Sequence, residues 1–323
     1  MRRRIVIAGA NGFLGRELSR WFLDRDWDVV GLVRPGATVV DACRPVEWDG
    51  HVLGEWAGEL DGAEALVNLA GRSVNCRYTP GNRATIMESR TESTRILGDA
   101  LSLANDPPHV WVNASTATIY RHAEDVPQDE VLGELGEGFS VEVAMAWEKA
   151  FFGARVPGRV RKVALRSSLV LAREKGTVFD YLWRLTRLGL GGHMAGGRQM
   201  MSWIHREDFC RAVEWLVHHD ECDGVVNVTA PSPVSNREFM GQMRKVAGMP
   251  FGLPATAWML ECGAFLMRTE TELVTKSRWV VPRRLLTHGF AFRWPDLAGA
   301  LEDLAPSPAP AGNLARKKVA SVK

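Results

Sequence analysis

The sequence predicts an α/β protein built on a doubly wound parallel sheet, with a smaller mixed module toward the C-terminus. Residues 5–8 form a short apolar run rich in β-branched side chains, which is typical of a buried strand. A glycine-rich turn follows, and an amphipathic segment with helical spacing opens at Arg16. Similar apolar runs, separated by helical or polar segments, recur along the first half of the chain. The further predicted strands are residues 29–33, 46–49, 65–71, 110–120 and 162–171.

The turn after the first strand carries Gly9, Gly12 and Gly15 at the spacing G-x-x-G-x-x-G. Between a strand and a helix, the first glycine permits a tight turn and the second lets a pyrophosphate approach the backbone. The third lets the helix pack close to the strand, and the N–H groups and dipole of the helix N-terminus hold the phosphates. The pattern predicts a dinucleotide-binding, Rossmann-type fold; the alternative is a glycine turn that binds nothing. The predicted cofactor contacts of the turn are Gly9, Asn11, Gly12, Phe13, Leu14 and Gly15.

The ends of the second and fourth strands indicate which cofactor is bound. An NAD-binding protein usually has an acid at the end of the second strand for the ribose 2′-hydroxyl, whereas this chain has Arg34 with no acid beside it. Because a guanidinium suits a 2′-phosphate, NADP(H) is favoured over NAD(H). The alternative for Arg34 is a solvated loop arginine. Three small or apolar residues at the end of the fourth strand, Leu69, Ala70 and Gly71, let the backbone pass close to a ribose or diphosphate.

Composition limits the other classes of function. The chain has 323 residues and a formal net charge of +2, which gives no case for binding nucleic acid. No apolar run reaches membrane-spanning length, so no membrane partner is expected. The 5 cysteines are scattered, with neither metal spacing nor a disulfide framework, so we expect no metal site and a cytoplasmic, reducing location.

The chain divides into two predicted units and a tail. Residues 1–170 form the NAD(P)-binding domain, with later elements returning to it within 200–230. Residues 171–303 form the smaller substrate module, and the Pro/Ala-rich, basic residues 304–323 form a disordered tail. The predicted helices and later strands are a helix over 83–104, a helix over 139–152, a strand at 199–205, a helix over 209–218 begun by Asp208, and a strand at 225–228.

Several motifs resemble those of the extended short-chain dehydrogenase/reductases, the group that contains nucleoside-diphosphate-sugar epimerases. The glycine turn, the strand end at 68–71 and the hydroxyl-rich run at 115–120 match that group. Other motifs resemble its atypical branch, the YfcH-like epimerase family, and residues 250–303 resemble that family's C-terminal domain of unknown function. The motifs of this branch are Arg77–Thr79, Ser89–Arg90, Trp147–Glu148, 197–205 and 230–239.

The resemblance implies an oxidoreductase or epimerase with one departure from the usual pattern. The parent superfamily uses Tyr-x-x-x-Lys on one helix face, where the lysine binds the nicotinamide ribose and lowers the pKa of the tyrosine. Here Lys149 takes the lysine position and Thr116 the hydroxyl position, but Met145 stands where the tyrosine is expected. The other candidate proton donors are Tyr120, Tyr78, Glu148 and His205. For Tyr120 the alternative is a buried packing residue, for His205 a backbone-bonded strand-end histidine, and for Lys149 an exposed helix lysine.

The resemblance also implies where a substrate lies. The candidate substrate contacts are Arg77, Ser115, Arg198, Gln199 and Trp203. It further implies homodimerisation through the helices at 83–104 and 139–152.

Two hypotheses on function follow from these observations. The first is an NADP-dependent oxidoreductase or epimerase acting on a small carbonyl or hydroxyl compound. The second, which the loss of the tyrosine favours, is an NADP(H)-binding redox sensor or scaffold with little catalysis.

Overall fold

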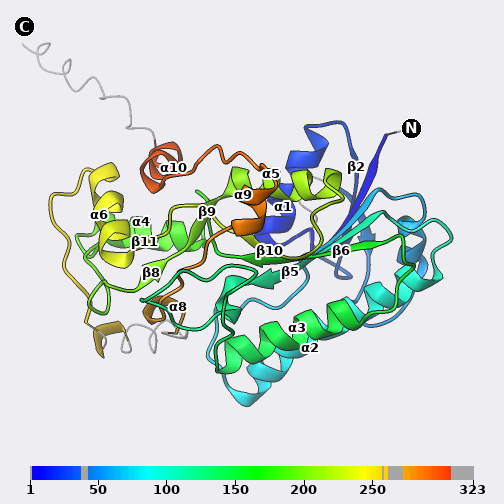
Figure 1. Cartoon of the computed structure of the whole chain (residues 1–323), viewed down its shortest axis with the longest axis horizontal. Coiled ribbons are helices and arrows are strands. Elements are labelled where there is room, and N and C mark those ends of the chain that lie inside the picture. Colours follow the sequence, from blue (N-terminus) through cyan, green and yellow to red (C-terminus); the bar gives the residue numbers. More distant parts are fainter. Residues whose placement is uncertain (1, 38–42, 257, 261–271, 307–323) are drawn as a thin grey trace, which may run out of the picture.

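A seven-stranded parallel sheet forms the centre of the molecule (Figure 1). The computed structural model describes residues 2–37, 43–256, 258–260 and 272–306. The strand order is β10-β6-β5-β4-β1-β2-β3. Because the order reverses between β1 and β4, this point of the sheet is a topological switch point. The strands are β1 (Arg4–Ala8), β2 (Asp28–Val33), β3 (Arg44–Glu47), β4 (Ala65–Asn68), β5 (Val110–Thr116), β6 (Arg161–Ser167) and β10 (Gly224–Val228). The predicted fold class is confirmed.

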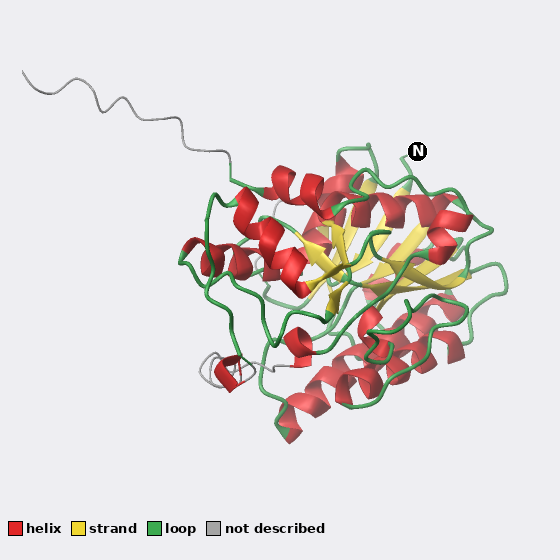
Figure 2. Cartoon of the chain, turned by 60° about the vertical axis from the view of Figure 1, so that its left-hand side comes forward, coloured by secondary structure: helices red, strands yellow, loops and turns green. Residues whose placement is uncertain are grey.

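Helices cover both faces of this sheet (Figure 2). Side chains of β1 alternate between two cores: Ile5 and Ile7 pack with α1 (Phe13–Leu23) and α5 (Arg206–His218), whereas Val6 and Ala8 pack with α2 (Pro80–Leu103) and α3 (Phe139–Gly153). Burial on both faces explains why the strand is a continuous apolar run rather than an alternating one. Among the described residues, no helix has both the length and the apolar character needed to span a membrane.

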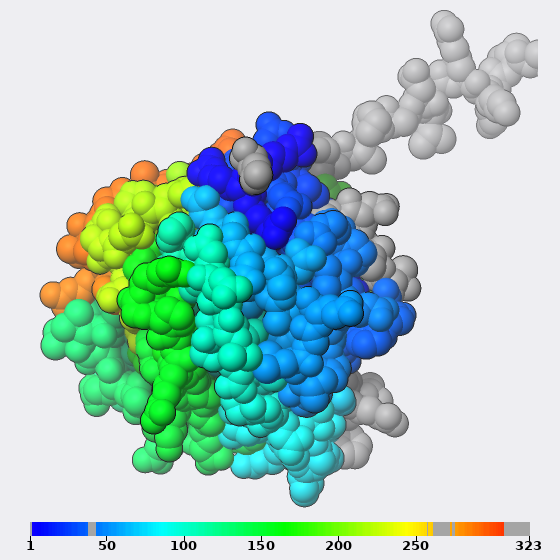
Figure 3. Space-filling view, turned by 90° about the vertical axis from the view of Figure 1, so that its right-hand side faces the viewer, coloured from blue at the N-terminus to red at the C-terminus, as the bar shows by residue number. Residues whose placement is uncertain are grey.

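A second core lies beside the sheet, where α4 (Val178–Arg187), α6 (Asn236–Val246) and α10 (Leu297–Leu304) gather at one end of the molecule (Figure 1). At the opposite end, the N-terminal segments, which are blue in Figure 3, lie beside the cyan and green segments that follow them in the sequence. The remaining elements are η1 (Glu55–Leu60), η2 (Ala117–Ile119), β7 (Leu169–Leu171), α4 (Val178–Arg187), β8 (Met200–Met201), β9 (Trp203–His205), β11 (Val234–Ser235), α6 (Asn236–Val246), α8 (Glu272–Thr275), α9 (Arg283–Thr287) and α10 (Leu297–Leu304).

Several predicted boundaries were wrong, among them the ends of the strands expected at 65–71 and 110–120, which lie at Asn68 and Thr116. The strand expected at 199–205 is two strands in different small sheets, because Ser202 leaves the ladder: its hydroxyl accepts the Val280 N–H at 2.8 Å. The run at 162–171 likewise splits into β6 and β7. Helix α5 begins at Arg206 and is capped by His205, because the fully buried carboxylate of Asp208 instead accepts backbone N–H groups from residues 293 and 294. Residues 307–323 of the predicted tail lie outside the described residues.

Candidate functional site

The glycine turn between β1 and α1 is held by two backbone hydrogen bonds. Gly9, at φ +78°, donates its N–H to the Leu32 carbonyl at 3.1 Å, and Gly12 donates to the Gly9 carbonyl at 2.9 Å. A Cβ on Gly15 would lie 2.4 Å from the Gly9 oxygen, closer than any side chain can approach. The left-handed backbone of Gly9 and the close helix packing at Gly15 therefore require glycine.

The N-terminus of α1 is left open for an anion. Gly12 precedes the helix without a side-chain cap, and the first turn has no acid. Among the described helices of eight or more residues, α1 alone has neither a side-chain cap nor an acid in its first turn. Helix α3 has Glu142 in its first turn, and the other helices are capped by side chains, as Thr79 caps α2. The unsatisfied N–H groups and the positive dipole end favour a phosphate at this position.

The segment after β4 lies against the glycine turn. A Cβ on Gly9 would lie 3.0 Å from the Ala70 nitrogen, so the two segments are in close contact. Asn68 holds this connection, because its side-chain oxygen accepts the Ala70 N–H at 3.0 Å and its amide donates to Asn113 on β5 at 2.7 Å. The predicted cofactor-contacting segments at residues 9–15 and 69–71 thus lie side by side.

A hollow of ≈ 270 Å³ lies where β2 and β3 end. Its lining residues are Pro35, Glu47, Trp48, Asp49, Val52, Gly54 and Trp56. Arg34, next to this hollow in the chain, is exposed, and none of the described residues forms an ion pair with its side chain. The Glu47 carboxylate accepts the Gly36 N–H at 3.2 Å, so an acid does occur in this corner, contributed by β3 rather than β2.

The hydroxyl-rich end of β5 is partly occupied by internal hydrogen bonds. Ser115, predicted to contact substrate, is buried and donates to Glu148 at 2.6 Å. Glu148 also accepts two hydrogen bonds from Arg166 on β6, at 2.8 and 2.7 Å. Burial alone would lower the pKa of Arg166, but this pair with Glu148 outweighs it and raises that pKa. Thr116 is half-buried and accepts the Thr118 N–H at 3.1 Å, which makes it the cap of η2.

Tyr120 has the features of a packing residue and not those of a proton donor. It is 1 % exposed, and its hydroxyl donates to the Asn227 side chain at 2.9 Å. Burial raises the pKa of Tyr120, although the Arg166 guanidinium over its ring opposes the shift. A catalytic phenol needs the opposite change at neutral pH. The structure therefore corrects the catalytic assignment of Tyr120 in favour of the packing alternative.

Lys149 lies on the exposed side of α3. Met145, one turn earlier, is 47 % exposed, and Lys149 is exposed as well. The face of α3 that meets the sheet carries Ala144 and Glu148 instead. The exposure of Lys149 fits the alternative of an exposed helix lysine, and its contact with the nicotinamide ribose stays a prediction.

The predicted substrate contacts are not brought together. Trp203 is fully buried in the second core, and its ring N–H donates to the Ser232 carbonyl at 3.2 Å. Gln199 is buried and donates to the Met194 carbonyl at 3.0 Å, and Arg198 is an exposed residue near Glu124. Burial corrects the assignments of Trp203 and Gln199. Arg77 is half-buried at the start of the segment that leads into α2.

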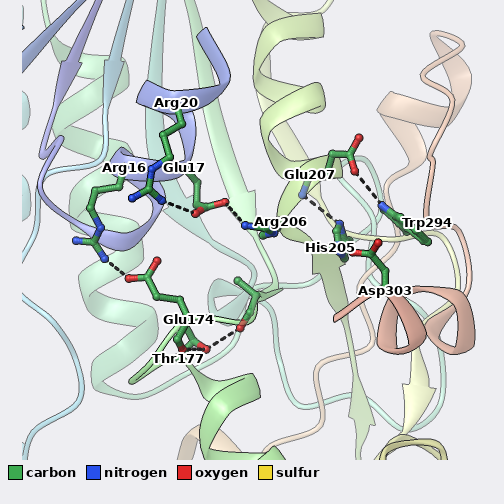
Figure 4. Close-up of polar contacts among 11 residues, drawn as sticks. Arg16, Glu17, Arg20, Glu174, Thr177, His205, Arg206, Glu207, Trp294 and Asp303 are labelled. Atoms are coloured by element: carbon green, nitrogen blue, oxygen red, sulfur yellow. Dashed lines mark hydrogen bonds and ion pairs between the residues drawn. The ribbon is translucent and has the colours of Figure 1, made fainter. Parts of the chain in front are cut away.

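His205 has a structural role, as its alternative proposed. Its Nδ1 accepts the Glu207 N–H at 3.2 Å, so the ring proton is on Nε2, which faces Asp303 at 3.2 Å (Figure 4). The same figure shows two ion pairs that join α1 to later segments: Arg16 with Glu174, and Glu17 with Arg206. These two ion pairs tie α1 to the segment that carries Glu174 and to the first residue of α5.

Arg90 of α2 is a further candidate site residue, beside the connection after β4. Its side chain contacts Gly71, crosses the ring of Trp147 at 5.1 Å and donates to the Ile86 carbonyl at 2.9 Å. Burial lowers the pKa of Arg90, and attraction to Tyr78 partly opposes this. Among the described residues, no carboxylate pairs with it. A half-buried cation without a carboxylate, beside the connection after β4, is suited to an anionic ligand. The Ser89–Arg90 motif was the available sequence signal.

This geometry is that of a Rossmann-type α/β protein, and comparison with known proteins gives its family. Residues 5–229 match the model of the NAD dependent epimerase/dehydratase family, and residues 255–304 match a domain of unknown function, DUF1731. The chain belongs to the NAD dependent epimerase/dehydratase family.

Relatives and solved structures cover nearly the whole chain. It is 30 % identical over 304 residues to epimerase family protein YfhF of Bacillus subtilis, covering 93 % of this chain and 97 % of that one. It is 29 % identical over 307 residues to the bovine (Bos taurus) epimerase family protein SDR39U1, covering 93 % and 99 %. A crystal structure of human SDR39U1 with NADPH superposes with a TM-score of 0.82 at 28 % identity, covering 93 % and 98 %.

Proposed function

We propose that this protein binds NADP(H) in preference to NAD(H) and acts as an oxidoreductase or epimerase on a small carbonyl or hydroxyl compound. The observation that carries the proposal is the uncapped N-terminus of α1, under a turn whose geometry requires Gly9 and Gly15. Human SDR39U1, a relative over nearly its full length, was crystallised with NADPH, which supports the choice of ligand.

Each part of the dinucleotide has a matching feature. The diphosphate would lie on the backbone N–H groups of residues 12–14. The adenine would enter the hollow beside Trp48, and Arg34 would face the ribose 2′-phosphate. The half-buried guanidinium of Arg90 would meet a further anionic group of the cofactor or substrate. When bound, the nicotinamide supplies hydride transfer.

Calorimetry with NADPH and NADH tests the cofactor preference. Loss of a charged hydrogen bond costs about 1.5–3 kcal/mol, so we expect Arg34→Ala to weaken NADPH binding by roughly ten- to a hundredfold while NADH binding changes little. Arg155→Ala is the matched control, because Arg155 is an exposed arginine after α3, remote in the chain from the nucleotide turn. Failure of the wild-type protein to bind either nucleotide would refute the proposal.

A second candidate function is an NADP(H)-binding sensor or scaffold with little catalysis. It is favoured by α3, whose sheet-facing side has no phenol and carries Ala144 in its centre. The two functions differ in turnover, so NADPH oxidation should be measured with a panel of small aldehydes, ketones and diketones. Turnover that falls in Thr116→Ala but not in Thr118→Ala would exclude the sensor.

A further inference from the structure

The guanidinium of Arg90 is held between α2, α3 and the segment after β4. It lies over the ring of Trp147 on α3, with its Cζ 5.1 Å from the ring centroid. A Cβ on Gly71 would lie 3.3 Å from the same Cζ. The Trp147 ring is itself fixed, because its indole N–H donates to the Thr94 hydroxyl at 3.0 Å. These contacts hold the half-buried guanidinium in one place.

Among the described residues, no carboxylate neutralises this guanidinium. Arg90 donates a hydrogen bond to the Ile86 carbonyl at 2.9 Å, which is an uncharged acceptor. Glu88 is exposed and, two positions away on the helix, faces a different direction. Other carboxylates of α2 and α3 are paired with other arginines: Glu92 with Arg95, Glu142 with Arg83, and Glu148 with Arg166. Because shielding a cation from water without a counter-charge is unfavourable, an anion from outside the chain would complete this site.

The strand order places Arg90 on the other side of the glycine turn from the hollow proposed for adenine. The order is β5-β4-β1-β2-β3; the hollow lies where β2 and β3 end, whereas Arg90 lies beside the segment after β4. A dinucleotide that crosses the carboxyl ends of these strands with its adenine in the hollow directs its nicotinamide toward β4 and β5. Arg90 is therefore placed at the nicotinamide end.

The faces of the sheet separate Arg90 from the site proposed for the diphosphate. Helix α1, whose N-terminus would hold the diphosphate, packs on one face, and α2 packs on the other (Figure 1). The nicotinamide ring and its ribose carry no negative charge. An anion bound by Arg90 at this end would therefore belong to the substrate.

We propose that the substrate carries an acid group, a carboxylate or a phosphate, and that Arg90 binds this group. The inference rests on the proposed oxidoreductase or epimerase function, and it narrows the substrate to an acidic carbonyl or hydroxyl compound. The planar guanidinium offers charge-assisted hydrogen bonds to such an oxyanion. Holding the acid group at Arg90 orients the rest of the substrate toward the nicotinamide. Arg90 binds substrate and transfers neither hydride nor proton.

Calorimetry on the protein saturated with NADP⁺ tests this, since the oxidised cofactor cannot reduce a carbonyl probe. The probes are pyruvate and dihydroxyacetone phosphate, each beside its neutral counterpart, methyl pyruvate or dihydroxyacetone. We expect an acid to bind roughly ten- to a hundredfold more tightly than its counterpart. Arg90→Met should abolish this preference, because it keeps an apolar stem on Trp147 and removes the charge. Arg83→Met is the matched control: Arg83 is also an α2 arginine over an aromatic ring, but it is paired with Glu142, so its loss should leave the preference in place.

The affinity for NADPH separates the substrate from the cofactor. Arg90→Met should leave this affinity unchanged, and Arg90→Lys, which keeps the charge without the planar fork, should keep part of the preference for acids. A preference that persists in Arg90→Met, or a wild-type complex that binds no acid more tightly than its neutral counterpart, would overturn the proposal. A tenfold loss of NADPH affinity in Arg90→Met would overturn it too, by assigning Arg90 to the cofactor phosphate. Absence of NADPH binding in the wild-type protein would instead refute the proposed function.

Discussion

Gly15→Ala separates the architectural and the nucleotide-binding roles of the glycine turn. Gly15 in α1 and Gly241 in α6 are both helical glycines. An added Cβ at Gly241 has only the Arg244 side-chain tip near it, at 3.8 Å. At Gly15 the same atom would lie 2.4 Å from the Gly9 oxygen and 2.7 Å from the Ala10 Cα, against ordinary contacts of 3.4 Å or more.

The two substitutions should change stability in opposite directions. Alanine is favoured over glycine inside a helix by roughly 0.5–1 kcal/mol, so Gly241→Ala should stabilise the protein by about that amount. At Gly15 the backbone of the turn must move by about 1 Å to relieve the clash, and overpacking of this kind costs about 1–3 kcal/mol. The movement displaces the Gly9 carbonyl and the N–H groups that would hold the diphosphate.

Thermal unfolding and calorimetry measure the two effects separately. Gly15→Ala should lower the melting temperature by roughly 2–8 °C and weaken NADPH binding on the order of tenfold or more. Gly241→Ala should raise the melting temperature slightly and leave the affinity unchanged. If Gly15→Ala bound NADPH like the wild type, the diphosphate would not lie on this turn.

Other residues give independent tests. Glu47→Gln should increase the preference for NADPH over NADH by a few fold in calorimetry, because it removes a negative charge from the corner proposed for the 2′-phosphate; an unchanged ratio would refute that placement. Glu148→Gln should lower the free energy of unfolding, measured with a chemical denaturant, by about 3–5 kcal/mol, because it leaves a buried arginine without its carboxylate. Glu92→Gln removes the carboxylate of an exposed pair and should lower the free energy of unfolding by less than about 1 kcal/mol. Similar losses of unfolding free energy in the two variants would contradict the greater importance of the buried pair. Burial lowers the pKa of His205, so the unfolded chain binds more protons below pH ~6.5 and stability falls as the pH drops through that value. His205→Asn keeps a capping side chain and should flatten this pH dependence of the melting temperature; an unchanged slope would count against it.

Local features of the sequence predicted the part of the site that depends on backbone geometry. The strand, the three glycines and the helix are contiguous, and their roles follow from steric limits within about ten residues. Strand ends at Arg34 and at residues 69–71 were also predictable, since parallel strands bring their carboxyl ends to one edge of the sheet. The Asn68 side chain that joins two of these ends was not predicted, because its partner Asn113 is far along the chain.

The side-chain part of the site could not be predicted in the same way. Lys149 fits a four-residue spacing after Met145, but spacing alone does not say which face of a helix meets the sheet. That face is set by the bond between Glu148 and Ser115, a contact between separate elements. Trp203 belongs to a motif that resembles substrate-binding segments, yet the second core packs around its ring and removes it from any ligand. Long-range packing decided both positions.

The two candidate functions share the glycine turn and differ at the stripe of α3 that runs from Ser140 to Glu148. Glu148 is committed to Arg166 and Ser115, and Ala144 has no proton to exchange. A proton donor for catalysis would therefore have to come from residues other than the part of α3 that contacts β5. Nucleotide binding and turnover then reside in different residues, so substitutions should separate them.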